Sequence, residues 1–223
     1  MSADAANAAL EELGVVPKTA RRHRQHGNPF SIRGKLDRPN WKEMFGREAP
    51  FALDIGCGLG CFLLELARLH PEWNAVGFEI RKHFVDHVKR QAQALALPNV
   101  DAVLANANSQ LDDLIPEKSV AFVSLNFPDP WYKRRHHKRR VLQESWLDLL
   151  VKRLIPNAEL HIMTDVAPLA YEMRDVLVSD HRFVHQQSTD GFATCTTTGI
   201  KSEREKTHEA RKEPIYRLHF RLA

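Results

Sequence analysis

FALDIGCGLG, residues 51–60, is the stretch that indicates the fold most strongly, because a short buried strand runs directly into a glycine-rich turn. A segment of helical periodicity continues to about residue 67. Glycines in such a turn let the backbone approach a ligand closely and adopt positive φ angles. The spacing is G-x-G-x-G, whereas a dinucleotide-binding turn needs a third glycine three positions after the second, where this chain has Cys61. The turn predicts a nucleotide-type pocket and disfavours NAD.

Outward from this turn, short apolar segments alternate with segments of helical periodicity. Further strands are predicted at 75–79, 100–105, 120–127, 159–163, 182–185 and 216–222, and further helices at 83–95, 142–154 and 169–178. This alternation predicts an α/β fold: a doubly wound, mostly parallel, seven-stranded sheet with helices on both faces. Residues 26–223 are expected to form a single domain, and residues 1–25, which are polar and then basic, a flexible N-terminal segment.

The composition argues against several classes of protein. Hydrophobic residues make up 43% of the chain, which is typical of a soluble globular protein. The sequence has no apolar run of about 18 residues that would predict a membrane span, and its first residues do not resemble a secretory signal. Three cysteines are too few to indicate a disulfide framework and favour a reducing compartment. We therefore expect a cytoplasmic protein without a membrane partner.

Two groups of metal-ligating residue types are unfavourable as metal sites. Cys57 and Cys61 lack the two-residue spacer of a zinc knuckle and a second pair nearby. His136 and His137 have no carboxylate or cysteine at ligand spacing, and the arginines on both sides of them would repel a cation. On these grounds the sequence predicts no metal site.

Polar residues follow the predicted strands at the edge where ligands bind to such sheets. Glu79 ends the second strand about 20 residues beyond the turn, where a carboxylate can accept hydrogen bonds from a ribose diol. Asn106 follows the third strand. Together with Gly56 and Gly58, these residues predict a site for a nucleoside-type cofactor.

The most specific segment is NFPDPWYKRRHHKRR, residues 126–140, directly after the predicted fourth strand. Two prolines stiffen a turn around Asp129, and Trp131 either packs beneath this turn or stacks on a base. Residues 133–140 hold six permanent cations, although the net charge of the whole chain is only +4. Such concentrated charge next to the expected pocket favours an acidic polymer as partner. A solvated run of charges, or one of nuclear-localisation type, is the alternative.

This segment resembles the F-P-D-P-W…K…R-H…K-R-R signature of tRNA (guanine-N7)-methyltransferases. Residues 53–58, 164–165, 202–205 and 214–216 are similar to further motifs of that family, so the resemblance extends from about residue 50 to the C-terminus. The chain departs from the family in two places. A serine begins the 202–205 motif where the family usually has threonine, and Lys212 stands where it usually has glycine.

The resemblance implies the Rossmann-like fold of class I methyltransferases. It also implies S-adenosylmethionine as methyl donor, with S-adenosylhomocysteine as product, and tRNA as partner, methylated on N7 of a guanine (position 46, in the variable loop). The implied residues are Asp54, Gly56, Gly58, Glu79, Asn106 and Asp129 for the cofactor; Asp129 for catalysis; Lys133, Asp165, Ser202 and Glu205 for the target nucleoside; and Arg135, His136, His137, Lys138, Arg139 and Arg140 for RNA.

The chemistry of this transfer agrees with those residue types. N7 of guanine has an in-plane lone pair and no proton, so the reaction needs alignment more than a general base. A carboxylate near the ring favours the positive charge that develops on the purine. Asp165 has a second interpretation as the cap of the following helix. Alternatives for the whole chain are a class I methyltransferase of another RNA base or a protein side chain, and a non-catalytic RNA-binding protein. Nothing in the sequence requires a partner subunit.

Overall fold

A seven-stranded sheet organises the computed structural model, which describes residues 27–186, 191–196 and 198–223. Its strands are β1 (Phe51–Ile55), β2 (Asn74–Glu79), β3 (Val100–Leu104), β4 (Val120–Asn126), β5 (Leu154–Thr164), β6 (Phe183–His185) and β7 (Tyr216–Leu222). Their order is β3-β2-β1-β4-β5-β7-β6. β1 to β5 pair in parallel, and β7 runs antiparallel to both of its neighbours. The prediction of a doubly wound, mostly parallel, seven-stranded sheet is confirmed.

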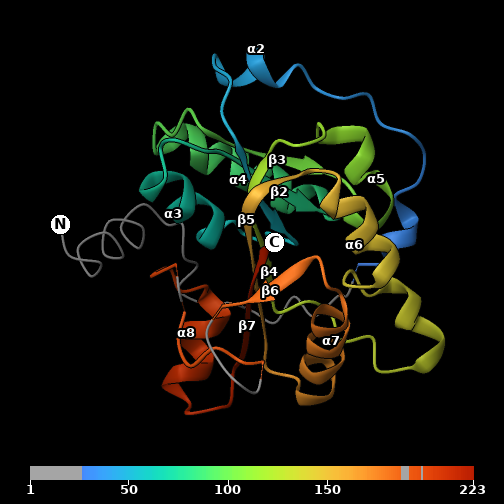
Figure 1. The fold of residues 1–223 in the computed structure, drawn as a ribbon. Helices are drawn as coiled ribbons and strands as arrows, with labels where there is room; N and C mark the ends of the chain where they lie inside the picture. Colours follow the sequence, from blue (N-terminus) through green and yellow to red (C-terminus); the bar gives the residue numbers. More distant parts are fainter. Residues whose placement is uncertain (1–26, 187–190, 197) are drawn as a thin grey trace.

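Helices cover both faces of this sheet (Figure 1). They are α2 (Trp41–Phe45), α3 (Cys61–Leu69), α4 (Lys82–Ala94), α5 (Ala107–Leu114), α6 (Glu144–Val151), α7 (Ala167–Ser179) and α8 (Glu203–Ala210), with the 3-10 helices η1 (Pro29–Ser31) and η2 (Arg134–Arg139). The apolar faces of α3 and α4 pack against alanines of β2 and β3. Those of α5, α6 and α7 pack against the larger apolar residues of the opposite face.

The central strands are buried on both faces. Every residue of β1 and β2 is buried, as expected for parallel strands that are covered by helices on either side. The strand order reverses between β1 and β4, because the chain first builds outward to β3 and then returns to the other side of β1. Ligands of such sheets bind at the carboxyl ends of the strands beside this point of reversal.

Three of the described α-helices were not predicted from the sequence, namely α2, α5 and α8. α5 is short, with only a few buried apolar residues such as Leu111 and Leu114. α8 is almost wholly polar, and Glu205 is the one buried residue in it, so it has no apolar stripe that periodicity could detect. β5 begins at Leu154, five residues before the predicted start, and α6 accordingly ends at Val151.

The lead-in before β1 was expected to be irregular, but it contains α2. The side chain of Trp41 is buried and its Nε1 donates to the carbonyl oxygen of Leu114 at 2.8 Å, which fastens α2 to the end of α5. The expectation for residues 1–25 concerns a segment outside the described residues. None of the described helices has the length and apolar character needed to cross a membrane.

The departure at Lys212 has a structural counterpart. Lys212 follows α8 with a φ of 55°, and its amide donates to the carbonyl of Glu209 while the amide of Glu213 donates to that of His208. This pair of hydrogen bonds is the Schellman ending of a helix, whose left-handed residue is usually glycine. The lysine therefore keeps the conformation that the glycine of the family is suited to.

Candidate active site

The glycine turn lies at the carboxyl edge of the sheet, between β1 and α3. The amide of Gly56 donates to the carbonyl oxygen of Phe78 at 2.8 Å, which anchors the turn to β2. Gly56 and Gly60 have φ angles of 78° and 81°, a conformation that residues with a side chain seldom adopt. A Cβ atom at Gly60 would lie 2.6 Å from Cγ2 of Val88. The glycines therefore allow both the turn and the close approach of α3 to α4.

Glu79 holds the turn from the end of β2. Its side chain is almost fully buried, and Oε2 accepts a hydrogen bond from the amide of Gly58 at 3.1 Å. Oε1 accepts from the amides of Ile80 and Arg81 at 2.8 and 3.0 Å. The Arg81 guanidinium donates to both oxygens, at 3.1 and 3.2 Å. One carboxylate thus orders the backbone of two loops, and one cation covers it.

Asp54 is buried beneath the same turn. Ser124 Oγ donates to its Oδ1 at 2.8 Å, and Asn126 Nδ2 donates to it at 3.4 Å. Burial raises the pKa of the Asp54 carboxyl to about 7; the two hydrogen bonds oppose the rise and the charge of Glu79 adds to it. The group below the turn therefore titrates near neutral pH.

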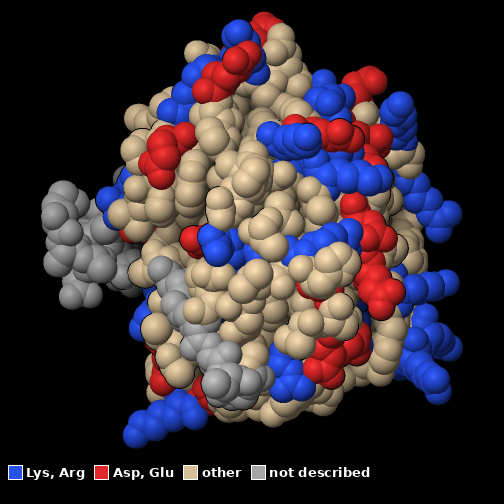
Figure 2. Space-filling model, viewed as in Figure 1, with Lys and Arg blue, Asp and Glu red and all other residues tan. Residues whose placement is uncertain are grey.

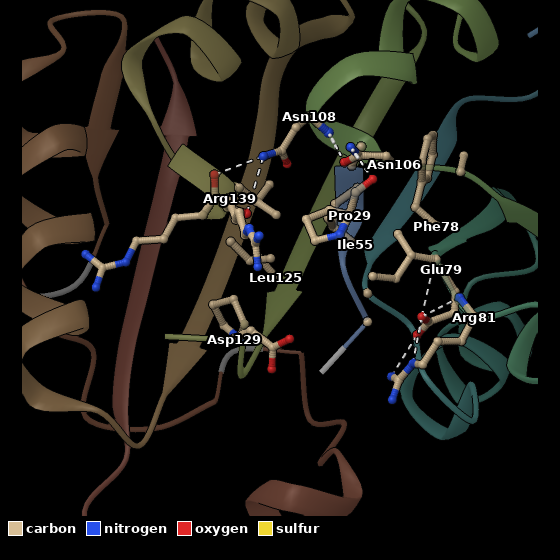
Figure 3. Close-up of a pocket in the computed structure, with 18 of the residues that line it drawn as sticks. Pro29, Ile55, Phe78, Glu79, Arg81, Asn106, Asn108, Leu125, Asp129 and Arg139 are labelled. Atoms are coloured by element: carbon tan, nitrogen blue, oxygen red, sulfur yellow. Dashed lines mark hydrogen bonds and ion pairs between the residues drawn. The ribbon is translucent and has the colours of Figure 1, made fainter. Parts of the chain in front are cut away.

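A pocket of about 780 Å³ of empty space, part of it open to solvent, lies between the turn and the end of β4. It brings together four of the residues that the sequence predicted for the cofactor, namely Gly56, Glu79, Asn106 and Asp129. Figure 3 shows Glu79 on the β2 side of this space and Asp129 on the side of the loop after β4. Asp54 lines a neighbouring hollow, which shares Gly56 with the pocket, and Gly58 contributes its amide to Glu79.

Asn106 joins the pocket to the lead-in segment. Its Oδ1 accepts from the amide of Asn108 and so caps α5, and its Nδ2 donates to the carbonyl oxygen of Pro29 at 3.1 Å (Figure 3). Pro29 and Gly27 both line the pocket. The sequence did not predict this wall, because the lead-in has no periodicity and its partners lie about 77 residues away along the chain.

The Pro-Asp-Pro corner lies between two residues with positive φ. Phe127 has a φ of 51° and Trp131 a φ of 45°, and such left-handed non-glycine residues cost about 1–3 kcal/mol each. The Phe127 amide donates to the carbonyl oxygen of Met163 at 2.7 Å, which ties the corner to β5. Neighbouring structure thus holds Asp129 in a strained turn, as is common at functional sites.

Arg140 is placed differently from the RNA contact that was expected. It is 9% exposed, and its Nε and Nη2 donate to the carbonyl oxygen of Pro130 at 2.9 and 2.7 Å. Nη1 pairs with Glu172 on α7, and Nη2 also lies 3.1 Å from His137 Nε2. The guanidinium faces the corner and not the solvent, because a backbone carbonyl and a carboxylate take its donors. In this structure Arg140 therefore clamps the corner, and its contact with RNA stays a prediction.

Of the remaining basic residues of this segment, Arg139 lines the pocket and the others do not. Lys133, Arg135 and Lys138 are exposed, whereas His136, His137 and Arg139 are partly buried. The Arg139 guanidinium lies 4.8 Å from the ring centre of Trp131. Burial and the surrounding cations lower the pKa of His136. Lys and Arg side chains project together from one margin of the molecule, on the right in Figure 2.

Asp165 lies at the end of β5 but outside the main pocket. Arg204 donates to both of its oxygens at 3.0 Å, and His208 Nε2 lies 3.4 Å from one of them. These residues line a separate open hollow beside α8. The capping position of α7 belongs to Val166, whose amide is satisfied by Thr164 Oγ1. Asp165 is therefore not the cap of the helix, and it is paired within the chain.

Ser202 and Glu205 also have partners within the chain. Ser202 caps α8, because its Oγ accepts from the amide of Glu205 at 3.2 Å. Glu205 is fully buried, and its Oε1 accepts from Arg217 Nε and Nη2 at 3.0 and 2.8 Å. Its Oε2 makes no hydrogen bond among the described residues. Of the four predicted nucleoside contacts, Lys133, Asp165, Ser202 and Glu205, none lines the main pocket.

Most of this chain is similar in sequence to known methyltransferases. A family model described as "putative methyltransferase" matches residues 48–218. A tRNA (guanine-N(7)-)-methyltransferase of Prochlorococcus marinus (strain MIT 9313) is 40% identical over 190 residues, which cover 82% of this chain and 80% of the relative. A tRNA (guanine-N(7)-)-methyltransferase of Microcystis aeruginosa (strain NIES-843 / IAM M-2473) is 35% identical, covering 90% of this chain and 98% of the relative.

Solved structures show the same fold at much lower identity. The 16S rRNA methyltransferase KamB has a TM-score of 0.58 at 14% identity and covers 84% of this chain and 95% of its own. The aminoglycoside resistance methyltransferase NpmB1 has a TM-score of 0.56 at 19% identity and covers 85% of this chain and 99% of its own. These likenesses concern the arrangement of the sheet and helices alone.

Proposed function

The chain belongs to the tRNA (guanine-N7)-methyltransferase family, and from this membership we propose that it transfers a methyl group from S-adenosylmethionine to N7 of a guanine in tRNA. The observation that carries the proposal is the pocket at the carboxyl ends of β1 to β4. It joins the glycine turn, Glu79 and Asn106 to Asp129, and the basic segment η2 begins five residues after Asp129. A cofactor site and a site for a polyanion are thus adjacent.

The residues of the pocket fit the nucleoside part of the cofactor. Phe78 and Ala105 give one apolar wall, and Asn106 and Glu79 supply polar atoms beside it. Glu79 would hold the ribose hydroxyls, since carboxylate oxygens accept hydrogen bonds from a diol. Because the Arg81 guanidinium bonds both oxygens in this structure, a ribose would replace Arg81 there while the backbone donors stay. When bound, the cofactor supplies a methyl group on a sulfonium.

The protein contributes alignment and charge to the transfer. The N7 lone pair forms the new bond to carbon, the carbon–sulfur bond breaks with its electron pair going to sulfur, and the positive charge passes to the purine. No proton has to be removed. We assign to Asp129 the stabilisation of that charge, and to the rigid corner the alignment that makes such a displacement fast. The apolar rings of Phe127 and Trp131 line the same pocket and limit access of water.

The exposed part of the basic segment suits the sugar–phosphate backbone. Lys133, Arg135 and Lys138 are exposed. Such cations provide affinity for nucleic acid that depends on salt but does not distinguish between base sequences. Arg139 and Trp131 offer a stacked pair beside the pocket. We propose that the guanine lies in the variable loop, that it leaves its stack to reach the pocket, and that the protein acts in the cytoplasm without a partner subunit.

The proposal is tested by incubating purified protein with tRNA and methyl-labelled cofactor and analysing the digested nucleosides. The expected product is 7-methylguanosine, and a matched transcript with adenosine in place of the variable-loop guanosine should stay unlabelled. Label in another base, or in protein, would support a methyltransferase of a different acceptor. Absence of heat on titration with S-adenosylhomocysteine would support a non-catalytic RNA-binding protein.

A further inference from the structure

Three potential metal ligands meet on the sheet face outside the active site. His161 on β5 and His219 on β7 are direct partners across the antiparallel ladder. Glu159 lies two residues before His161, so its side chain projects from the same face. One ligand atom of each residue lies within 4.8 Å of those of the other two. The antiparallel pairing of β5 and β7 thus brings two imidazoles and one carboxylate close together.

The separations of these atoms suit a tetrahedral metal ion. Glu159 Oε2 lies 2.9 Å from His161 Nε2 and 3.4 Å from His219 Nε2. Two ligands that are each about 2.0–2.1 Å from a tetrahedral zinc ion are about 3.3 Å apart. The two imidazole ring centres are 4.0 Å apart. Small side-chain rotations would therefore complete three metal–ligand bonds without movement of the strands.

His219 is the member that most needs a partner. It is 8% exposed, and neither of its ring nitrogens makes a hydrogen bond among the described residues. Buried polar atoms are nearly always satisfied, and each exception requires an explanation such as an absent ion. A metal ion bound to Nε2 would give His219 the partner that it lacks. Glu159 is about half-exposed, with 48% of its side chain accessible, which leaves a route for the ion and room for a water ligand.

The nearest cation on the opposite strand is engaged elsewhere. Arg221 stands across from Glu159 in the β5–β7 register, but its Nη1 donates to Asn157 Oδ1 at 2.5 Å. No ion pair between Arg221 and Glu159 is present among the described residues, and the carboxylate instead faces the two histidines. The negative charge is therefore directed at the place where a cation would bind.

We propose that Glu159, His161 and His219 bind one divalent transition-metal ion of the zinc class, which ties β7 to β5. Two imidazoles and a carboxylate match the borderline ligand preference of zinc and of its neighbours in the first transition series. His161 lies three residues before the end of β5, about 10 Å from the active-site edge. The ion would therefore stabilise the strand that follows α8, and it would take no part in methyl transfer.

Sequence patterns did not indicate this site, because its members have no motif spacing. His161 and His219 are 58 positions apart, from 219 − 161, and only the antiparallel pairing brings them together. The earlier expectation of no metal site considered only Cys57 with Cys61 and His136 with His137. The present group includes the carboxylate and the facing imidazoles that those groups lack.

The site is tested on the full chain after removal of metal with a chelator. We expect one cobalt(II) per chain with visible d–d absorption, displacement by zinc(II), and an increase in Tm on adding zinc, since a ligand that binds only the folded state stabilises it. His219→Gln should weaken zinc binding at least about tenfold and abolish the increase in Tm. Glu159→Gln, at a half-exposed position that does not endanger folding, should do the same. The exposed His181→Gln serves as matched control and should bind as wild type.

Three results would overturn the site: no stoichiometric binding, equal binding by all three variants, or binding that is lost only when Cys57 and Cys61 are replaced by serine. Methyl transfer to tRNA is expected to proceed equally in the stripped and the zinc-loaded protein. The site and the proposed activity can therefore fail independently of each other.

Discussion

Two regions of this molecule use their carboxylates in different ways. We call the region around Glu79 the cofactor side and the region around Asp165 and Glu205 the acceptor side. On the cofactor side, Glu79 accepts hydrogen bonds from backbone amides of the glycine turn and of the loop after β2. On the acceptor side, Glu205 is paired with Arg217 and Asp165 with Arg204. The first side is held by backbone amides together with one ion pair, between Glu79 and Arg81, whereas the second is built around ion pairs between side chains.

This difference suggests how the two substrates are accommodated. The backbone amides that hold Glu79 are in place before a ligand arrives, so the Arg81 side chain is the part that has to move when a ribose binds. A carboxylate already paired with arginine can contact a nucleoside only if the arginine moves or the ligand joins the pair, which adds a cost to binding. We infer that the cofactor side is preorganised apart from the Arg81 side chain, whereas on the acceptor side two ion pairs rearrange when tRNA binds. Asp129 lies where the two sides meet.

Asp129→Ala tests whether the carboxylate between the two sides acts in the methyl-transfer step. Loss of a charge-stabilising group at the reacting purine should lower kcat at least about a hundredfold, with tRNA affinity nearly unchanged. Single-turnover methylation and filter binding measure the two quantities. Asp129→Asn keeps the size and one acceptor oxygen, so its kcat should lie between those of the wild type and the alanine variant. Normal methylation by the alanine variant would place the chemistry elsewhere.

Glu205→Ala tests whether the acceptor side depends on its ion pairs. The variant leaves the Arg217 guanidinium, which is itself largely buried, without its main partner, so the free energy of unfolding should fall by roughly 3 kcal/mol or more. Urea denaturation measures the change. Glu203→Ala on the same helix removes a partly exposed pair with Lys206 and should cost less than about 1 kcal/mol. A raised KM for tRNA without loss of stability would instead show that Glu205 serves the nucleoside.

The pH dependence of stability tests the buried carboxyl on the cofactor side. The pKa of Asp54 is raised to about 7 in the folded protein, so between about pH 4 and 7 the folded state keeps a proton that the unfolded state has lost. This group should therefore make stability fall as pH rises through that window, by about 1.4 kcal/mol per pH unit. Asp54→Asn should remove that slope, and the control Asp86→Asn, at a partly exposed carboxylate paired with Lys82, should keep it. Equal slopes in wild type and Asp54→Asn would contradict the assignment.

Arg140→Ala separates the clamp on the corner from the RNA-binding surface. Loss of two hydrogen bonds to the Pro130 carbonyl should loosen Asp129 and lower kcat about tenfold, with the salt dependence of tRNA binding unchanged. The exposed Arg135→Ala should do the reverse, raising KM and reducing the salt slope by about 1. The same kinetic pattern in both variants would show that Arg140 also contacts RNA.

The two sides also differed in how far the sequence predicted them. Strand ends and the glycine turn are local features, so Gly56, Glu79 and Asn106 were expected at one edge and the structure brings them together there. The acceptor side depends on partners distant in sequence, such as Arg217 for Glu205, and no local pattern indicates which arginine will pair. The burial of Arg140 was not foreseen for the same reason. Its neighbours in the sequence are surface cations, but its partner Glu172 lies 32 residues away.

Lys212→Gly tests whether local backbone geometry also shapes the acceptor side. Lys212 occupies the left-handed position after α8, where glycine is unstrained, although glycine loses more entropy on folding. The two effects oppose each other, and the net result should be a gain of about 0.5 kcal/mol in the free energy of unfolding. Lys206→Gly within α8 is the matched control and should lose about 1 kcal/mol. A loss of stability in Lys212→Gly would mean that the lysine side chain stabilises this helix end by more than the backbone strain costs. Contacts between side chains would then dominate at this helix end, as they do at Glu205.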